Sequence, residues 1–139
     1  MTLEREVAVR DIMMKGPVTM ECDDILDIAD DIMELGRIRH LPVLENGRVV
    51  GVLSQRDLFH SALVKLLGFK HREQKDVMRT VRVRDVMSKP VIAISPDVSV
   101  KVAAHLMMAK KIGCLPVVEG EGLIGLVTET DILRYFVEH

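Results

Sequence analysis

The strongest constraint on the fold of this chain is an internal repeat. The motif GVLSQRD, at residues 51–57, returns as GLVTETD at residues 125–131, an offset of 74 positions (125 − 51). Each motif reads glycine, two apolar residues, a hydroxyl residue, two variable residues and aspartate. The same offset, without a gap, aligns these identical residues: Val9 with Val83, Asp11 with Asp85, Met13 with Met87, Asp23 with Asp97, Ala29 with Ala103, Met33 with Met107, Ile38 with Ile112, and Leu41–Val43 with Leu115–Val117. So many identities in one register indicate a tandem duplication, so we expect two copies of one folding unit.

Composition excludes several functional classes. The net charge is −2, whereas a nucleic-acid-binding domain normally carries a clear basic excess. No apolar run reaches the roughly 20 residues that a membrane-spanning helix needs, and the charged N-terminus lacks the apolar core of a secretion signal. The two cysteines, Cys22 and Cys114, are far apart, which disfavours a disulfide framework or a zinc site. We therefore expect a soluble cytoplasmic protein that contacts neither nucleic acid nor a membrane.

Hydrophobic periodicity predicts the order β-α-β-β-α for each copy, and so a mixed α/β fold. Short turns at 9–13 and 83–87 lead into apolar strands at 17–20 and 91–94. An amphipathic helix is predicted after each strand. Its apolar positions are Ile25, Ile28, Ala29, Ile32 and Met33 in the first copy, and Val98, Val102, Leu106 and Ala109 in the second.

Residues at the element ends support this order. Asp23 and Asp97 precede the helices, where a carboxylate can cap free amides, and Gly36 is placed to close the first helix. The next stretch reads as a hairpin, because an Asn46-Gly47 pair between two apolar runs is a strong turn signal. The glycines at the equivalent turn of the second copy are Gly120 and Gly122.

A final helix is predicted to begin at Ser54 in the first copy and at Thr128 in the second. The apolar face of the first of these helices consists of Leu58, Phe59, Ala62, Leu63, Leu66 and Leu67. A charged connector at 70–80 separates a first motif at 7–69 from a second at 81–139. A unit of about 55 residues has a marginal core by itself. We therefore expect the copies to pack face to face, by pseudo-twofold symmetry, into one intertwined module.

The hydroxyl residue and the aspartate of the repeated motif have a local structural explanation. A Ser or Thr followed three residues later by an acid forms a capping box at a helix start, and the acid also interacts favourably with the helix dipole. Ser54 with Asp57, and Thr128 with Asp131, fit this pattern. On the residues alone, helix capping is better supported than ligand binding.

Two long stretches of the chain resemble CBS motifs, which are named after cystathionine β-synthase. They are VRDIM…PVTM…IRHLPVLENGRVVGVLSQRDL and VRDVM…PVIAI…IGCLPVVEGEGLIGLVTETDI. The resemblance covers nearly the whole chain, and the order and spacing of the motifs make it specific. It implies a stand-alone CBS pair, or Bateman module. Such pairs usually bind an adenosyl compound (AMP, ADP, ATP or S-adenosylmethionine) between the copies and change conformation or assembly on binding.

The resemblance also implies roles for residues of the repeated motif. Asp57 and Asp131 would hydrogen-bond the ribose hydroxyls of the ligand. Phosphate would lie at the helix start, where free amides suit an anion. The residues placed beside that phosphate are Ser54, Arg56, Thr128 and Thr130, with Arg56 at the place of the hydroxyl residue Thr130.

Arg39 and His40 form a second candidate element. Residues at this place in the family point at phosphate, and guanidinium suits phosphate because its fork donates two hydrogen bonds at once. Gly113 and Cys114 replace them in the second copy, which therefore lacks the charge. The alternative is that Arg39 is a solvated surface charge and His40 an ordinary strand residue.

The resemblance places the adenine ring beside the starts of the first strands. For Val18 and Ile92, plain strand core is an equally good interpretation. The residues expected to flank the ring or line the cleft are Gly16, Pro17, Val18, Thr19, Ile38, Leu41, Pro42, Ser88, Lys89, Pro90, Val91, Ile92, Ile112, Gly113, Cys114, Leu115 and Pro116.

These features favour a regulatory adenosyl-nucleotide sensor that is not an enzyme and carries no cofactor and no metal. Glu129 and Asp131 could be read as a catalytic carboxylate pair, but no nucleophile or base relay accompanies them. The histidines lack metal-ligand spacing. We also expect an unidentified regulated protein partner, and a homodimer through apolar residues of the second helices. These residues are Leu58, Ala62, Leu63, Leu66, Leu133, Phe136 and Val137.

Two alternatives to a sensor remain open. The first is a ligand-free protein-interaction and dimerisation scaffold, in which the clefts serve only packing. The second is a nucleic-acid-binding CBS protein, which the acidic balance disfavours.

Overall fold

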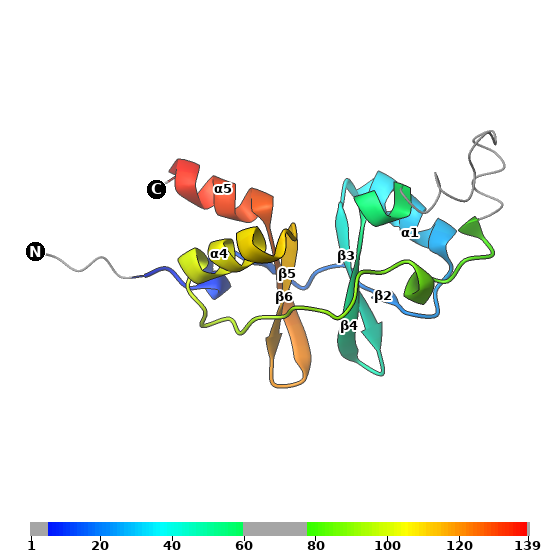
Figure 1. Cartoon of the computed structure of the whole chain (residues 1–139), viewed down its shortest axis with the longest axis horizontal. Coiled ribbons are helices and arrows are strands. Elements are labelled where there is room, and N and C mark those ends of the chain that lie inside the picture. The colour runs from blue at the N-terminus through cyan, green and yellow to red at the C-terminus, as the bar shows by residue number, and fades with distance from the viewer. Residues whose placement is uncertain (1–5, 60–77, 139) are drawn as a thin grey trace, which may run out of the picture. The chain divides into compact units, whose positions relative to one another are not determined.

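The computed structural model describes residues 6–59 and 78–138, and the chain divides into two compact units (Figure 1). Unit 1 spans Met1–Pro17 and Ile92–His139, and unit 2 spans Val18–Val91. Each unit contains helices and a three-stranded sheet. The predicted α/β class is therefore confirmed.

Unit 2 is built on the sheet β2-β3-β4. Its elements are β2 (Met20–Glu21), α1 (Leu26–Gly36), β3 (His40–Glu45), β4 (Arg48–Ser54) and the short 3₁₀ helix η2 (Val83–Asp85), and residues 55–59 are helical. β2 runs parallel to β3, and β3 runs antiparallel to β4. The predicted order of strand, helix, two strands and helix is present in this unit.

Unit 1 is built on the sheet β1-β6-β5. Its elements are η1 (Val9–Asp11), β1 (Met14–Lys15), α4 (Val100–Lys110), β5 (Cys114–Glu119), β6 (Gly122–Thr128) and α5 (Glu129–Glu138). β1 was not predicted, and it pairs antiparallel with β6. The strand predicted at 91–94 is reduced to one parallel bridge between Ile94 and Val117. The strand predicted at 17–20 starts only at Met20, because Pro17 has no amide hydrogen for a ladder.

The lead-in segment of each copy, residues 7–15 and 81–89, packs in the unit that is formed by the rest of the other copy. Each backbone hydrogen bond that docks one lead-in segment has a counterpart at the repeat offset in the other unit, so the exchange is reciprocal. The compact units therefore differ from the linear copies. The backbone bonds that dock the lead-in segments are Val83 N to Asp24 O (2.9 Å), Arg84 N to Cys22 O (2.9 Å), Val9 N to Val98 O (2.8 Å) and Arg10 N to Pro96 O (3.1 Å).

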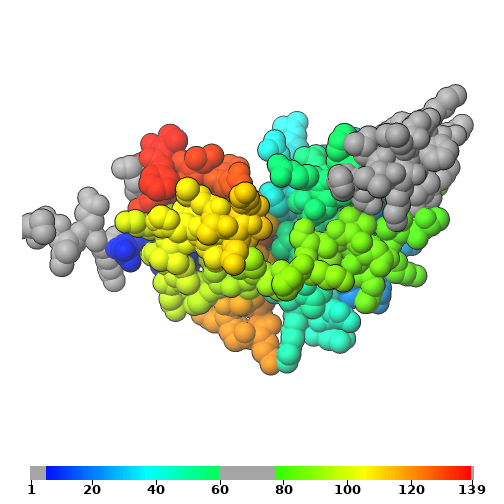
Figure 2. Space-filling view, viewed as in Figure 1, coloured from blue at the N-terminus to red at the C-terminus, as the bar shows by residue number. Residues whose placement is uncertain are grey.

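Each lead-in segment also contributes to a hydrophobic core. Val83 lies in the core of unit 2 and Val9 in the core of unit 1, and both side chains are fully buried. Burial of one valine side chain stabilises a fold by about 1.5–3 kcal/mol. Figure 2 shows the second lead-in segment, in green, lying against the teal surface of unit 2. Each exchanged segment therefore contributes a residue to a hydrophobic core.

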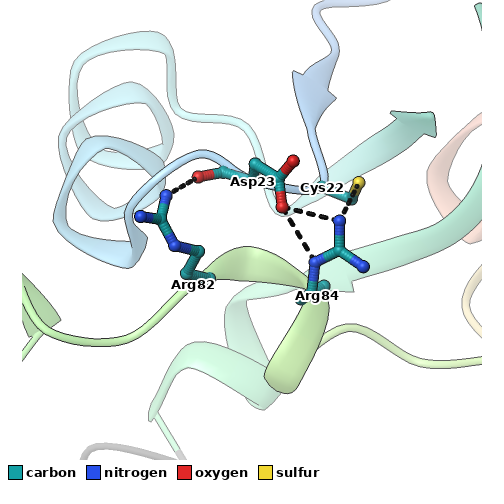
Figure 3. Close-up of polar contacts among 4 residues, drawn as sticks. All are labelled: Cys22, Asp23, Arg82 and Arg84. Carbon is teal, nitrogen blue, oxygen red and sulfur yellow. Dashed lines mark hydrogen bonds and ion pairs between the residues drawn. The ribbon is translucent and has the colours of Figure 1, made fainter. Parts of the chain in front are cut away.

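Asp23 and Asp97 do not cap the helices that follow them, and this prediction is wrong. The carboxylate of Asp23 accepts hydrogen bonds from Nη2 and Nε of Arg84, at 2.6 and 2.9 Å (Figure 3). Arg82 donates from Nη1 to the carbonyl oxygen of Asp23 at 2.5 Å. Asp97 is paired with Arg10. An arginine fork offers a carboxylate two charged donors, which a single helix amide does not match.

Other groups satisfy the amides at these helix starts. At α1, Leu26 N donates to Val81 O at 2.8 Å, so the backbone of the lead-in segment provides the acceptor. At α4, the hydroxyl of Ser99 accepts from Val102 N at 3.1 Å, which is a conventional side-chain cap. Val100 N also donates to Val7 O at 2.8 Å, so both helices begin on the backbone of a lead-in segment and α4 has a side-chain cap in addition.

α1 buries Ala29 and Met33 as predicted, whereas α4 buries a face that differs from the predicted one. Ile28 and Val102, which were predicted to face the core, are 45% and 55% exposed, because the sheet contacts the neighbouring apolar stripe. Gly36 is the last residue of α1, but the left-handed residue after it is Arg37 (φ 53°), so the predicted glycine cap is wrong. The buried positions are Leu26, Ala29 and Met33 in α1, and Val100, Ala103 and Met107 in α4.

The apolar face predicted for the helix after Ser54 is described only in part. Leu58 is buried in the core of unit 2, so it is not available to a partner as predicted. The neighbouring Phe59 is 68% exposed. The remaining residues of that face, from Ala62 to Leu67, and residues 70–77 of the connector lie outside the described residues.

The two hairpin turns are confirmed. Asn46 and Gly47 both have positive φ, 52° and 79°, as a type I′ turn requires. In the second hairpin Gly120 has a φ of 62°, whereas the φ of Glu121 is not positive. A positive φ at the first turn residue alone is the pattern of a type II′ turn. Gly122 begins β6 and is not part of the turn.

The glycine that opens each repeated motif is required by the exchanged lead-in segment. A Cβ on Gly51 would lie 2.7 Å from Sδ of Met87 and 2.9 Å from the carbonyl oxygen of Ser88. A Cβ on Gly125 would lie 3.0 Å from the carbonyl oxygen of Met14, and it would also collide with the Met13 side chain. The lead-in segments therefore cross the second strand of each hairpin at a distance that only glycine permits.

We expect Gly51→Ala and Gly125→Ala each to lower the free energy of unfolding by about 1–3 kcal/mol, because the added methyl group overpacks a close contact. Chemical denaturation of the purified variants would measure this loss. Gly122→Ala is the matched control, since its Cβ would meet only Glu119 O at an ordinary 3.7 Å. Its stability should stay within about 0.5 kcal/mol of the original. Unchanged stability of both Gly51→Ala and Gly125→Ala would contradict the close approach.

Candidate functional sites

The first candidate site is the capping box at the end of β4 in unit 2. The amide of Ser54 donates to Oδ2 of Asp57 at 2.9 Å, and the amide of Asp57 donates to Oγ of Ser54 at 3.0 Å. This reciprocal pair is the arrangement that the sequence predicted. It holds the Asp57 carboxylate, which is half-buried, at the start of the helix.

The second candidate site is the equivalent capping box at the end of β6 in unit 1. The amide of Thr128 donates to Oδ2 of Asp131 at 2.8 Å, and the amide of Asp131 donates to the hydroxyl of Thr128 at 3.4 Å. The same hydroxyl donates to Oδ2 at 3.1 Å. The capping box is thus confirmed in both copies.

The second oxygen of each aspartate is left free of the capping interaction. No residue in the described part of the chain donates a hydrogen bond to Oδ1 of Asp57. Oδ1 of Asp131 lies 3.7 Å from Nη1 of Arg134, which is an ion pair too long for a hydrogen bond. Arg134 was missed from the sequence, although its i+3 spacing to Asp131 is a usual signal for such a pair. Each carboxylate therefore keeps acceptor capacity for another molecule.

Arg39 and His40 lie beside the first site. The carbonyl oxygen of Arg39 accepts from Gln55 N at 2.8 Å, and His40 pairs in the sheet with Ser54. The backbone of Arg39 adjoins the helix start, and its side chain is exposed, so its guanidinium is accessible to an anion. A cation at the positive end of a helix dipole adds to the attraction for phosphate.

Gly113 and Cys114 occupy the same places beside the second site. The carbonyl oxygen of Gly113 accepts from Glu129 N at 3.0 Å, and Cys114 pairs with Thr128. Cys114 is buried, with 6% of its surface exposed. The backbone arrangement is therefore conserved between the two sites, while the positive charge beside the second site comes from Arg134.

The residues predicted to surround adenine fall into two groups. Ser88 reaches the first site directly, because its hydroxyl donates to Oδ2 of Asp57 at 3.2 Å. Those with exposed or half-buried side chains are Gly16, Pro17, Val18, Thr19, Ile38, Ser88, Lys89, Pro90, Val91, Ile92, Ile112 and Gly113. Those buried in the interior are Leu41, Pro42, Cys114, Leu115 and Pro116. Of these, Leu41 and Leu115 belong to the hydrophobic cores of unit 2 and unit 1.

The remaining motif residues are at the surface. Arg56 and Thr130 both occupy the second helical position after the hydroxyl residue, and both are exposed. Gly16 adopts a φ of 57° and donates its amide to Ile124 O at 3.4 Å within unit 1. Of the predicted site residues, Arg39 and Ser88 lie next to the first capping box, and all of them belong to unit 2.

Cys22 lies beside the Asp23–Arg84 ion pair but is not activated as a nucleophile. Arg84 donates from Nη2 to Sγ of Cys22 at 3.1 Å (Figure 3). Burial raises the pKa of the Cys22 thiol, and the nearby guanidinium only partly opposes this shift. A thiol with a raised pKa stays protonated at neutral pH, which disfavours nucleophilic chemistry.

In residues 6–59 and 78–138, no three His, Cys, Asp or Glu side chains come together as a metal site. None of the helices in those ranges combines the length and the apolar character needed to cross a bilayer.

Comparison with known proteins gives a consistent family. A curated CBS domain-containing protein of Dictyostelium discoideum is 30% identical over 135 residues, which cover 96% of this chain and 93% of that protein. The inosine-5′-monophosphate dehydrogenase of Methanocaldococcus jannaschii is 34% identical over 126 residues, which cover 89% of this chain and 22% of the enzyme.

A solved structure and a family model agree with this result. The CBS domain pair of protein MJ0100, in complex with 5′-methylthioadenosine and S-adenosyl-L-methionine, superposes with a TM-score of 0.79 at 25% identity, covering 96% of this chain and 98% of that one. The family model for the CBS domain matches residues 9–63 and 83–138. The chain therefore belongs to the CBS domain family, and it contains a tandem pair of these domains.

Proposed function

We propose that this CBS pair is a regulatory module that binds an adenosyl compound reversibly at the two candidate sites. AMP, ADP, ATP and S-adenosylmethionine are the candidate ligands. The observation that carries the proposal is that each capping box uses one oxygen of its aspartate and leaves Oδ1 without a hydrogen-bond donor from the described residues. A ribose hydroxyl is a suitable donor for that oxygen.

The comparison with MJ0100 supports the class of ligand. That CBS pair binds two adenosyl compounds, and this chain matches nearly its full length. The dehydrogenase relatives support a regulatory role less directly, because this region is only 22% of the Methanocaldococcus enzyme. Their catalytic activity is therefore not extended to this chain, and we propose that it is not an enzyme.

The two sites are proposed to differ in how they treat phosphate. Arg39 and His40 adjoin the first site, whereas Gly113 and Cys114 adjoin the second. We expect the first site to prefer ligands that carry phosphate, because guanidinium donates two hydrogen bonds to it. Regulation further requires that the ligand bind one conformation or assembly more tightly than another.

The partner that receives the signal, the cytoplasmic location and the absence of nucleic-acid binding stay predictions from the sequence. A ligand-free scaffold is the main alternative, and it makes a different prediction about ligand-induced stability. Direct measurement of binding separates the two.

We expect AMP, ADP, ATP or S-adenosylmethionine to raise the melting temperature at millimolar concentration. A ligand that binds only the folded state stabilises it by mass action, by about 2.7 kcal/mol at a concentration a hundred times its Kd. Differential scanning fluorimetry followed by calorimetry would measure the effect. Flat results with all four compounds would favour the scaffold.

Asp57→Asn tests the ribose contact while keeping the helix cap. The amide oxygen of asparagine can still accept from Ser54 N, but its NH₂ group would replace the open Oδ1 acceptor. We expect affinity at the first site to fall by roughly ten- to a hundredfold, since hydrogen bonds to charged groups contribute about 1.5–3 kcal/mol. Calorimetric titration with AMP would measure the loss.

The matched control is Ser99→Ala, which removes a helix cap remote from both motifs. It should lower stability by about 1 kcal/mol and leave affinity unchanged. An Asp57→Asn protein that binds AMP as tightly as the original would limit Asp57 to a capping role.

We further propose that the chain forms a homodimer through the outer face of α5. Leu133, Phe136 and Val137 lie at i, i+3 and i+4 positions and are 63%, 63% and 85% exposed. Apolar side chains grouped in this way on one helix face are a usual sign of an interaction surface. Figure 2 shows α5, in red, at the surface of unit 1.

Phe136→Glu should raise the dimer dissociation constant at least about tenfold, because a charge would be buried in the interface. Sedimentation velocity over a range of concentrations would measure it. Glu138→Gln, on the same helix, is the control and should leave association unchanged. A protein that sediments as a monomer at tens of micromolar, with and without AMP, would contradict the dimer.

A further inference from the structure

The outer faces of α1 and α4 differ in charge at equivalent positions of the repeat. The outer face of each helix lies opposite its buried stripe, and the offset of 74 positions relates the two faces residue by residue. Acidic residues on α1 are replaced by basic or neutral residues on α4. The equivalent pairs are Asp27 and Lys101, Ile28 and Val102, Asp31 and His105, Glu34 and Met108, and Leu35 and Ala109.

Both outer faces keep large apolar side chains at the surface. On α1, Leu35 is 87% exposed and Ile28 is 45% exposed. On α4, Met108 is 75% exposed and Val102 is 55% exposed. An exposed apolar patch that is rimmed by polar residues typically marks a surface that binds another protein. Each outer face therefore has the composition of a contact surface.

Two of the acidic residues bring negative charge to the surface of α1. Asp27 is paired with Arg79 within unit 2, with 3.5 Å between Oδ2 and Nε, and its side chain is only 20% exposed. Asp31 and Glu34 are exposed. On α4, Lys101 and His105 are exposed at the positions equivalent to Asp27 and Asp31. The outer face of α1 is thus acidic, and that of α4 is basic.

These charges determine which helix of a second copy each face can accept. Two α1 helices placed face to face would bring Asp31 and Glu34 against the same carboxylates of the other copy, and juxtaposed like charges disfavour a complex. α1 placed against α4 would instead bring those carboxylates against Lys101 and His105. Lysine is a cation, and histidine has an N–H donor for a carboxylate in either protonation state. Unlike helices are therefore the favoured pair.

α4 also adjoins the surface that is proposed to form the dimer. α4 and α5 pack against each other in unit 1, and Figure 1 shows α4 in yellow beside α5 in red. A second copy that covers α5 therefore comes close to α4. That copy carries an acidic α1 face of its own, which complements the basic face of α4. A second copy of this chain is consequently the occupant that fits best.

We infer that α1 of one copy packs against α4 of a second copy through these outer faces. In a two-fold dimer the contact occurs twice, because the same two surfaces meet in both directions. The inference rests on the homodimer proposed above. It adds which helices meet, and it excludes contacts between two α1 helices or between two α4 helices.

Charge reversal tests the electrostatic part of this contact. Lys101→Glu should raise the dimer dissociation constant at least about threefold, because it places a carboxylate near Asp31 and Glu34 of the other copy. Asp31→Lys should have a similar effect. The double variant with both substitutions should return to within about twofold of the original, since opposite charges face each other again. Sedimentation velocity over a range of concentrations would measure these constants.

Two controls separate association from a structural effect. Lys110→Glu makes the same change of charge on α4, but Lys110 lies seven positions after the buried Ala103 and so away from the outer face. Its dissociation constant should stay within about twofold of the original. The double variant is the second control. A helix damaged by one substitution would not be repaired by a substitution in the other unit.

Cross-linking identifies the helices that meet. One chain carries Asp31→Cys and a second carries His105→Cys. Both positions are central in their helices, so they meet whichever way the helices cross. A short bifunctional maleimide should link the two chains when they are mixed, and it should link neither chain to itself. The original chain gives the background, because Cys22 and Cys114 are both buried.

The outcomes distinguish this inference from the homodimer itself. Efficient cross-linking of either variant alone would show that like helices meet, which would overturn the inference and leave the dimer intact. A dimer whose dissociation constant ignores Lys101→Glu and Asp31→Lys would also overturn it, and would leave these faces to a partner of another kind. If the original chain sediments only as a monomer, the proposed homodimer and this inference both fail.

Discussion

The docking of each lead-in segment onto the other copy is the interaction on which the rest of the structure depends. Backbone hydrogen bonds, a buried valine and an arginine–aspartate pair repeat in both units at the same offset. Gly51 and Gly125 make the close approach possible, since any Cβ there would collide with the arriving segment. The fold therefore requires both copies, because each core takes a buried valine from the other copy, and the sheet of unit 1 also takes β1 from it. This reciprocal exchange gives a marginal unit of about 55 residues the burial that it would otherwise lack.

The exchange also determines what each candidate site contains. The aspartates are held by their own helix starts, but the neighbours that distinguish the sites come from elsewhere in the fold. Ser88 reaches Asp57 from the lead-in segment, whereas Met14 holds the equivalent place in unit 1. Capping and ligand binding do not compete in such a site. One carboxylate oxygen serves the helix, and the other keeps its acceptor capacity.

The two copies share part of their cores and differ at residues next to the candidate sites. Leu41 and Leu115, or Val43 and Val117, are identical and fully buried, because a change of volume in a packed core is costly. Arg39 and Gly113 differ, although their carbonyl oxygens accept the same backbone hydrogen bond. A common backbone thus supports two sites of unequal charge and hydrogen-bonding capacity.

The sequence by itself determined the features that depend on near neighbours. The Asn46-Gly47 turn and both capping boxes join residues three or fewer positions apart, so these contacts can be predicted from short sequence motifs. The repeat likewise predicted two α/β copies. Only the tertiary structure decided the contacts between distant residues, because many pairings satisfy the same local pattern. Asp23, which was predicted to cap a helix, instead pairs with Arg84, 61 positions away, and α4 buries Val100, Ala103 and Met107 in place of its predicted face. The contact between Ser88 and Asp57 likewise depends on tertiary structure, because the docked lead-in segment places the Ser88 hydroxyl beside the Asp57 carboxylate.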